Sequence, residues 1–301
     1  MSFDVVVVGN AGIDTNVYLA GEKIDFSVEA NFTRNIDCIG QAGGYASRGY
    51  ASMRLRTAFI GAVGADANGD WIKRVFSQQG INTKGLFIDP AGTSHSINIM
   101  YKDGHRKNFY DGKSHMTLDA PLEIARGLFD GARLIHFNIP NWARELLPIA
   151  QSSGAAIACD IQDVVDPADP YRRDFILQFN FLFFSAANYV DPDPIMTYFW
   201  SMNPDLEIVA GMGEKGCAVG TAHQIMHYPA LSLDLPIIDT NGAGDTLAVG
   251  YLTARVMDGF SPKESALRGQ VAARFCCAQN ASSEHLITRK LLSEYLAQER
   301  H

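Results

Sequence analysis

The chain has 301 residues, of which 47% are hydrophobic and 19% are charged, and this is enough apolar material for a large packed core. A net charge of −8 and a pI of about 5.4 argue against non-specific binding to nucleic acid and against binding to an anionic membrane surface. No apolar run approaches the roughly 20 residues of a membrane-spanning helix, and the five cysteines form no C-x-x-C pair, so we expect a cytoplasmic protein with free, reduced thiols.

Short apolar strands alternate with helices from the N-terminus onward. The segment "DVVVVGN" predicts a buried strand at residues 4–10 rather than a signal peptide, because it lacks a basic region and meets a glycine at once. Beyond it we expect a helix over 43–55, a strand over 57–64 and a helix over 68–80 that ends at Gly80.

The same alternation fills the middle of the chain. We expect strands at residues 133–138, 155–161, 181–186 and 207–213, and helices at 142–154, 170–179 and 193–202. Near the C-terminus, Ser261-Pro262-Lys263-Glu264 is a capping box with proline at the first helical position, and it predicts a helix start. This rhythm favours an α/β fold with a mainly parallel, doubly wound sheet flanked by helices.

Two segments interrupt this rhythm. Residues 14–38 contain no clear helix, and residues 94–111 indicate two strands around a turn at Asp103-Gly104. Together they would form a small β sheet outside the main domain, which suits a lid over a site, although a surface hairpin explains the pattern equally well. The predicted division is an α/β domain at residues 1–13, 39–93 and 112–301, and a β lid at residues 14–38 and 94–111.

The octet "DTNGAGDT", residues 239–246, follows the apolar "LPII", which predicts a strand, and precedes a run with helical spacing. A helix start exposes backbone N–H groups without internal partners at the positive end of the helix dipole. Gly242, Ala243 and Gly244 have little or no side chain to keep a phosphate away from those groups. Asp245, in the first helical turn, suits either of two roles: a base that takes the proton of a hydroxyl attacking phosphorus, or a helix cap.

The longer stretch "IDTNGAGDTLAVGYL" resembles the C-terminal signature of the ribokinase-like, or PfkB, carbohydrate kinases. Other stretches are similar to family segments in the same order along nearly the whole chain: "VVGNAGIDTNV", "GQAGGYASRGYA", "FIGAVGADANGD", "YKDGHRKNF" and "GMGEKGCAVG". The resemblance implies an α/β kinase domain with a small β lid. It also implies an ATP-dependent phosphotransferase that uses Mg²⁺ and phosphorylates a hydroxyl of a small sugar or sugar derivative.

The resemblance assigns roles on the acceptor side of the site. Asp245 would be the general base that deprotonates the acceptor hydroxyl. The anion hole would consist of the backbone amides of Gly242, Ala243 and Gly244. The acceptor itself would be held by Asp14, Gly43 and Gly44.

The resemblance also assigns a nucleotide side and two cation sites. The nucleotide would lie along Asn188, Gly213, Lys215 and Gly216. Asp191 would act on Mg²⁺ indirectly, since it stands where the family has a glutamate and keeps the charge with a shorter reach. Asp239, with the backbone near Asn241, would help bind a monovalent cation such as potassium.

Three positions depart from the family pattern or extend it. Arg48 stands where the family usually has asparagine, so its guanidinium would either bind a carboxylate or phosphate on the acceptor or pair with a local acid such as Asp14. Arg106, on the predicted lid, would be a second clamp on the same anionic group. Ser282 falls where the cation loop of the family has glycine, which argues against activation by potassium.

Two alternatives to a sugar kinase stay open at this point. A nucleoside kinase of the same family would share every motif above. A non-catalytic sensor of sugars or nucleotides would share the scaffold, although binding alone needs no base at Asp245. A small-molecule substrate, with a homodimer as a candidate assembly, completes the expectation about partners.

Overall fold

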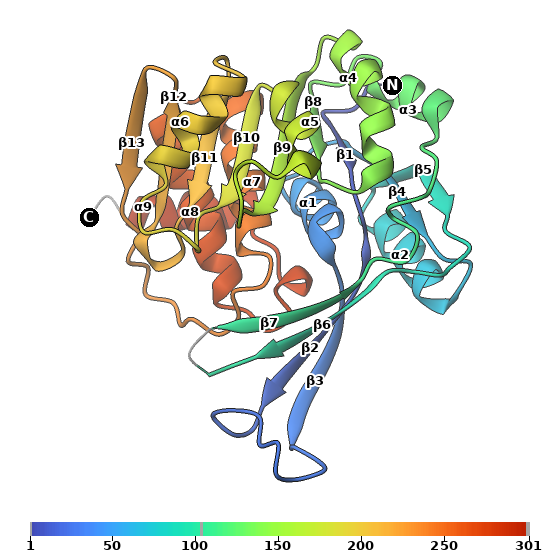
Figure 1. Ribbon diagram of the computed structural model, residues 1–301, viewed down its shortest axis with the longest axis vertical. Helices are drawn as coiled ribbons and strands as arrows, with labels where there is room; N and C mark the ends of the chain where they lie inside the picture. The colour runs from blue at the N-terminus through green and yellow to red at the C-terminus, as the bar shows by residue number, and fades with distance from the viewer. Residues whose placement is uncertain (1, 103–104, 299–301) are drawn as a thin grey trace.

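The computed structural model describes residues 2–102 and 105–298, so the turn expected at Asp103-Gly104 lies outside the described residues. Within that part of the chain the largest element is a nine-stranded sheet in the order β13-β12-β11-β10-β9-β8-β1-β4-β5 (Figure 1). Its strands are β1 (Val5–Val8), β4 (Thr57–Val63), β5 (Asn82–Ile88), β8 (Leu134–Phe137), β9 (Ala156–Asp163), β10 (Phe181–Ser185), β11 (Glu207–Gly211), β12 (Cys217–Thr221) and β13 (Gln224–Tyr228). All neighbouring pairs from β11 to β5 are parallel, while β12 and β13 pair antiparallel at one edge.

Helices cover both faces of this sheet, because alternate residues of each strand point to opposite sides. In β1, Val6 and Val8 pack in one buried cluster, and Val5 and Val7 pack in the other. The first face carries α3 (Leu122–Phe129), α4 (Leu147–Ser152), α5 (Pro170–Leu177) and α6 (Asp193–Met202). The second carries α1 (Gln41–Ser52), α2 (Ala67–Gln78), α7 (Ala243–Leu252), α8 (Pro262–Cys277) and α9 (Arg289–Gln298). The expected doubly wound α/β fold is therefore confirmed.

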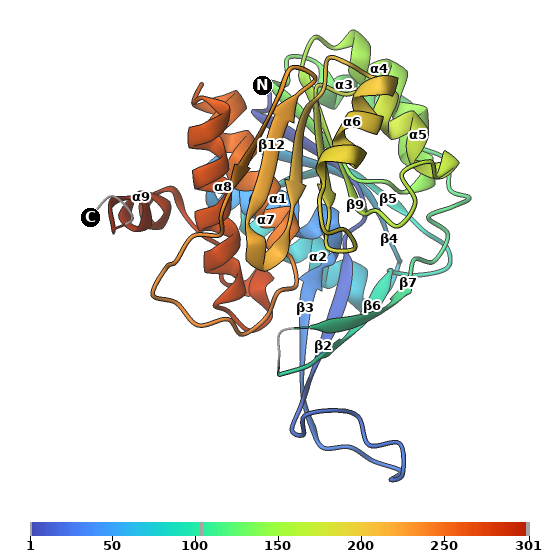
Figure 2. The same cartoon turned by 60° about the vertical axis from the view of Figure 1, so that its left-hand side comes forward.

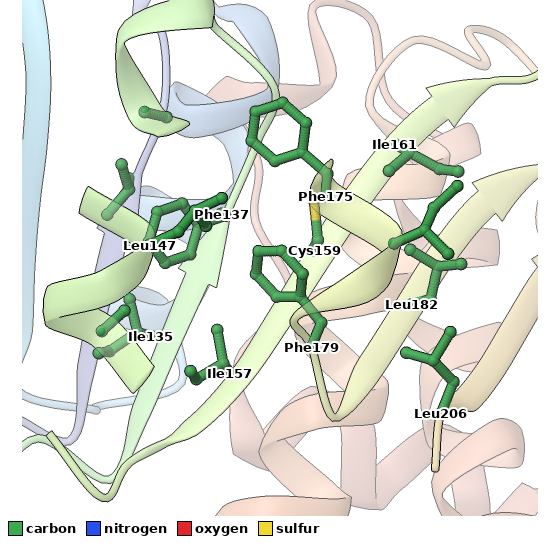
Figure 3. Packing of buried hydrophobic residues seen from close by; sticks show 14 of the residues in the cluster. Ile135, Phe137, Leu147, Ile157, Cys159, Ile161, Phe175, Phe179, Leu182 and Leu206 are labelled. Carbon is green, nitrogen blue, oxygen red and sulfur yellow. The ribbon is translucent and has the colours of Figure 1, made fainter. Parts of the chain in front are cut away.

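The first of these clusters shows how the interior is filled (Figure 3). Phe137 from β8, Phe175 from α5 and Phe179 just after α5 lie between the strands and the covering helices, with Phe137 and Phe179 edge to face at 5.4 Å between ring centroids. Such edge-to-face pairs add to the stabilisation that burial itself provides. This rigid base positions the loops at the carboxyl ends of the strands.

Most expected elements form within a few residues of their predicted bounds, and some differ. The helix expected over 142–154 is split into a 3₁₀ turn (η1, Asn141–Leu146) and α4, because Pro148 has no N–H to continue a helix from the preceding turn. Helix α7 runs on into a π turn (η3, Thr253–Met257). The capping box at Ser261 and Glu264 is present at the start of α8, as predicted.

A second sheet stands apart from the first and contains the strands in the order β3-β2-β6-β7. They are β2 (Gly12–Leu19), β3 (Thr33–Gly40), β6 (His95–Met100) and β7 (Arg106–Asp111). Figures 1 and 2 show this small sheet projecting from one end of the main domain, with the loop between β2 and β3 at its tip. Because β2 follows directly on β1, the small sheet begins at the carboxyl ends of the parallel strands, where α/β proteins place their ligands.

Candidate active site

Helix α7 begins directly after a left-handed turn at Gly242, whose φ is 77°. An added Cβ at Gly242 would lie 2.6 Å from Cε1 of Tyr45, so both the backbone angle and the space require glycine. Gly244 is exposed and has no atom within 4 Å of an added Cβ, so its backbone is open to a ligand. Ala243 differs, because its N–H donates to the carbonyl of Thr240 at 3.3 Å.

The segment before this turn is not the strand that "LPII" predicts. Residues 235–238 carry no strand, and the N–H groups of Ile238 and Asp239 both donate to the carbonyl of Cys277, at 2.7 and 3.2 Å. The N–H groups expected to bond to a neighbouring strand are therefore bonded to the last residue of α8 instead. Pro236, which has no N–H, suits this irregular path.

Two carboxyl groups lie near the start of α7. Burial raises the pKa of Asp245, Arg106 opposes that shift, and Asp14 adds to it. Asp160, buried in β9, also has a raised pKa, first because of its own burial and then because of the charge of Asp245. Neighbouring carboxyl groups with raised pKa values resist ionising together, and such a shift suits a group that accepts a proton near neutral pH.

A buried polar cluster lies around Asp14, on β2. Its Oδ2 accepts a hydrogen bond from Nδ2 of Asn241 at 3.0 Å and from the hydroxyl of Tyr45 at 3.3 Å. Its Oδ1 is also buried, and it has no hydrogen-bond partner among the residues that the structure describes. Burial raises the pKa of Asp14, while the bond from Asn241 lowers it. The unpaired oxygen can therefore accept a hydroxyl donor from a ligand.

Arg106 connects the small sheet to this cluster. It comes from β7, and its Nη1 donates to Oδ1 of Asn241. Burial raises the pKa of Asp14, Asp239 and Asp245, and the positive charge of Arg106 opposes that rise at all three. Arg106 therefore hydrogen-bonds an amide of the protein and acts electrostatically on carboxyl groups of the protein.

The paired glycines at the start of α1 have unequal surroundings. An added Cβ on Gly43 would lie 2.6 Å from the carbonyl oxygen of Asn10 and 2.9 Å from Phe59, whereas on Gly44 it would meet nothing closer than 3.6 Å. The Gly44 N–H donates to the same Asn10 carbonyl at 3.2 Å. Gly43 is thus required for close packing of α1 on the loop after β1.

Arg48 was expected to bind either an anionic group of the acceptor or a local acid. In the structure its guanidinium bonds to other side chains of the protein. Its side chain is 3% exposed; Nη1 donates to Glu284 at 2.8 Å and to Ser283 at 3.2 Å, and Nε donates to Gln79 at 3.0 Å. The local acid that it pairs with is Glu284 rather than Asp14. These contacts favour the alternative in which Arg48 anchors the loop Ser282–Glu284 (η4) to α1.

Three of the residues expected to bind the nucleotide lie in the connection between β11 and β12. Gly213 and Lys215 form an exposed 3₁₀ turn (η2, Gly213–Lys215), and Gly216 follows with φ 96°. An added Cβ on Gly216 would lie 2.1 Å from the carbonyl oxygen of Tyr228, so this glycine lets β12 pass close to the end of β13. Close packing alone therefore requires glycine at position 216.

Asn188 and Asp191 follow β10. Nδ2 of Asn188 donates to Oδ1 of Asp163 at 2.6 Å, at the end of β9. Asp191 lies with Asp193 and His227 in a group whose potential ligand atoms are all within 4.8 Å of one another. The carboxylate oxygens of Asp191 and Asp193 are of the kind that Mg²⁺ prefers, whereas His227 offers a ring nitrogen, and that nitrogen lies 2.8 Å from Oδ1 of Asp193.

Several side chains of this site were not predicted from the sequence. Asp160 and Tyr45 showed no local signal, and only the backbone near Asn241, not its side chain, was expected to matter. Tyr18, on β2, donates to Asp239 from 221 positions away. The sequence offers one signal for Tyr18: in a strand, residues 14, 16 and 18 share a face, so Tyr18 lies on the same face as Asp14.

The sheet order, the helices on both faces and the small second sheet define the ribokinase class of α/β fold. Solved structures agree: the model superposes on a microbiome-derived acarbose kinase with a TM-score of 0.90 at 24% identity, covering 99% of this chain and 100% of the other. It superposes on Arabidopsis thaliana ribokinase, solved with ribose and ATP, with a TM-score of 0.80 at 19% identity, covering 98% and 99%.

Sequence comparison gives the family. Residues 205–289 match the model of the pfkB family carbohydrate kinases. An acarbose 7(IV)-phosphotransferase of Actinoplanes sp. is 25% identical over 96% of this chain and 97% of its own length, and fructokinase-2 of Solanum lycopersicum is 26% identical over 79% of each. The chain thus carries a pfkB family match over residues 205–289, its named relatives over most of its length are carbohydrate kinases, and it is a carbohydrate kinase. Among its described helices, none combines the length and apolar character needed to cross a membrane.

Proposed function

We propose that this kinase transfers the γ-phosphoryl group of ATP to a hydroxyl of a small sugar or sugar derivative, with Asp245 as the general base. The observation that carries the proposal is the position of Asp245, one residue beyond the open glycine at the head of α7 and within the electrostatic reach of Arg106 and Asp14. In-line transfer needs a held phosphoryl group and an activated acceptor side by side.

The acceptor binds on the side of Asp14. The buried, unpaired Oδ1 of Asp14 accepts one sugar hydroxyl, and Asn241 and Tyr45 fix the carboxylate through its other oxygen. Gly43 and Gly44 bring backbone close to the same space. Arg106 lies above it on the small sheet, which acts as a lid that keeps water away from the phosphoryl group.

The transferring phosphoryl group lies on the N–H groups at the head of α7. Gly242 sets the turn, and the N–H groups of Gly244 and Asp245 follow it at the positive end of the helix. Ala243 contributes the absence of a bulky side chain rather than a free N–H, because its N–H is already engaged by Thr240. Donors held in place in this way stabilise charge that develops in the transition state.

ATP lies along Gly213, Lys215 and Gly216, with its phosphates toward α7. Asn188 and Asp191 would hold Mg²⁺, which neutralises charge on the phosphates when it is bound. The exposed ammonium of Lys215 adds a mobile positive charge at the nucleotide.

The candidate acceptors come from the relatives: acarbose and fructose. A neutral sugar is favoured over an anionic one, since the guanidinium of Arg48 is engaged by Glu284. A nucleoside acceptor and a non-catalytic sensor are the alternatives that the same experiment decides.

The test is an ADP-release assay with ATP and Mg²⁺ over acarbose, fructose, ribose, sugar acids and nucleosides, followed by the Asp245→Asn variant on the best acceptor. Asparagine keeps the shape and removes the base, so kcat should fall by about 10²–10⁴-fold while the melting temperature is retained. More than about half of the wild-type kcat in this variant would contradict the assignment of the base. ADP release with nucleosides alone would favour the nucleoside kinase, and ligand binding without turnover would favour the sensor.

A further inference from the structure

The hydroxyl of Tyr18 lies where the sequence resemblance expects a monovalent cation. It donates to Oδ2 of Asp239 at 2.5 Å, and the backbone N–H of Asn241 donates to Oδ1 of the same carboxylate at 2.8 Å. Asp239 is fully buried. Both oxygens of the carboxylate that would coordinate a cation therefore already have protein donors.

The same hydroxyl reaches the loop after α8. The N–H of Ala281 donates to the hydroxyl oxygen of Tyr18 at 2.9 Å, and Ala281 has a φ of 47° that turns the chain at this point. Tyr18 thus accepts from one segment and donates to the other. It connects the residue before the glycine turn with the C-terminal loop, as a shared ion would.

The second acceptor of this region is also engaged. The carbonyl oxygen of Asn241 accepts from Oγ of Ser282 at 2.5 Å and from Sγ of Cys276 at 3.5 Å. A cation needs oxygen lone pairs directed at it, whereas this region directs hydroxyl, thiol and N–H protons at those lone pairs. Potassium does not fit this set of donors.

We propose that Tyr18 replaces the monovalent cation, so that the glycine turn at Gly242 is positioned by a hydroxyl of the lid strand β2 and needs no potassium. Tyr18 is a positioning residue: it acts on the turn through Asp239 and does not touch the transferring group. Ser282 and Ala281 complete the connection from the C-terminal loop.

A further observation supports this assignment. The loop that carries Ser282 is also anchored by Arg48, through Ser283 and Glu284, so it is held in place without an ion.

The first measurement uses the wild-type protein and needs no substrate. Melting temperatures are compared in potassium and in tetramethylammonium salts at equal ionic strength, so that general screening is the same in both. Because ligand binding to the folded state raises the melting temperature, no potassium-specific rise is expected. A rise that saturates with potassium would overturn the proposal.

The second measurement rests on the proposed kinase function. With an acceptor found in the ADP-release assay, wild-type kcat should agree within about twofold between the two salts. Tyr18→Phe leaves Asp239 and Ala281 without their partner, and its kcat should fall about tenfold or more with acceptor KM changed much less. Tyr101→Phe, a half-buried tyrosine after β6 on the same small sheet, is the matched control and should retain wild-type kcat.

A kcat of wild-type size in Tyr18→Phe, or potassium activation of the wild type by fivefold or more, would overturn the proposal. If Tyr18→Phe does not fold, the two salt comparisons on the wild type still decide it. If no acceptor is phosphorylated, the proposed function fails, while the melting comparison continues to test whether Tyr18 replaces the cation.

Discussion

Gly242 and Gly244, at the start of helix α7, should respond in opposite ways to substitution by alanine. Gly242→Ala places a methyl group 2.6 Å from Cε1 of Tyr45, on a backbone with φ 77°. The Tyr45 ring is 3% exposed and its hydroxyl is bonded to Asp14 and Asn241, so it cannot turn away without breaking that cluster. Gly244→Ala, two residues on, meets no atom within 4 Å.

The magnitudes follow from these two environments. A left-handed conformation costs an L-residue roughly 1–2 kcal/mol, and inserting a methyl group into a packed region costs roughly 1–3 kcal/mol. Gly242→Ala should therefore lose about 2–5 kcal/mol of the free energy of unfolding, and its melting temperature should fall by roughly 3–8 °C. Gly244→Ala lies in a helix, where alanine is favoured over glycine by up to about 1 kcal/mol, so its stability should hold or rise slightly.

Activity separates the two roles further. The methyl group of Gly244→Ala lies on the open surface where the phosphoryl group is proposed to bind, so kcat should fall by about 10²-fold in a well-folded enzyme. Thermal unfolding and ADP release on both variants test this. An unchanged melting temperature for Gly242→Ala would refute the packing argument, and full activity for Gly244→Ala would refute the anion hole.

Two further predictions concern charges. Because only an ionised carboxylate accepts a proton, kcat should fall as pH drops from neutrality toward about 4, through the pKa of Asp245, which burial raises to about 6. Arg106→Gln removes a positive charge that lowers this pKa, so this limb of the pH–rate profile should move up by up to about one pH unit, and an unmoved limb would mean that the two groups do not interact. Arg48→Asn removes the bonds to Glu284 and Gln79 and should cost about 1–3 kcal/mol of unfolding free energy. The value of kcat/KM should fall equally for matched neutral and anionic sugars, and a fall confined to the anionic sugar would instead support a role of Arg48 in binding the acceptor.

Local patterns were sufficient for the architecture. A continuous apolar run such as Val5–Val8 indicates a strand that is buried on both faces. The capping box at Ser261 fixes a helix start through bonds within four residues. Whereas the strand predicted at residues 235–238 is replaced by bonds to the distant carbonyl of Cys277, the break in the helix expected over 142–154 is also local, since Pro148 is visible in the sequence. Information of this kind is carried by neighbours in the chain.

The partners of the site are not neighbours in the chain, and the sequence could not supply them. Arg48 is an unremarkable helix residue until Glu284, 236 positions later, is placed beside it. Asn241 could be assigned to a turn from its glycine neighbour, but its contact with Asp14 depends on how the small sheet sits over α7. Tertiary placement decides which of several chemically sensible roles such a residue takes.

One strand carries both the side chain proposed to bind the acceptor and the side chain proposed to position the turn. Asp14, Asn16 and Tyr18 alternate along β2, so they point to the same face, and each contacts the segment from Asp239 to Asn241. A shift of this strand by one residue would turn all three away together. Under the proposal that Tyr18 positions the glycine turn, a movement of the small sheet would be passed directly to the segment from Asp239 to Asn241. An ion bound between two loops of the main domain would lack that connection.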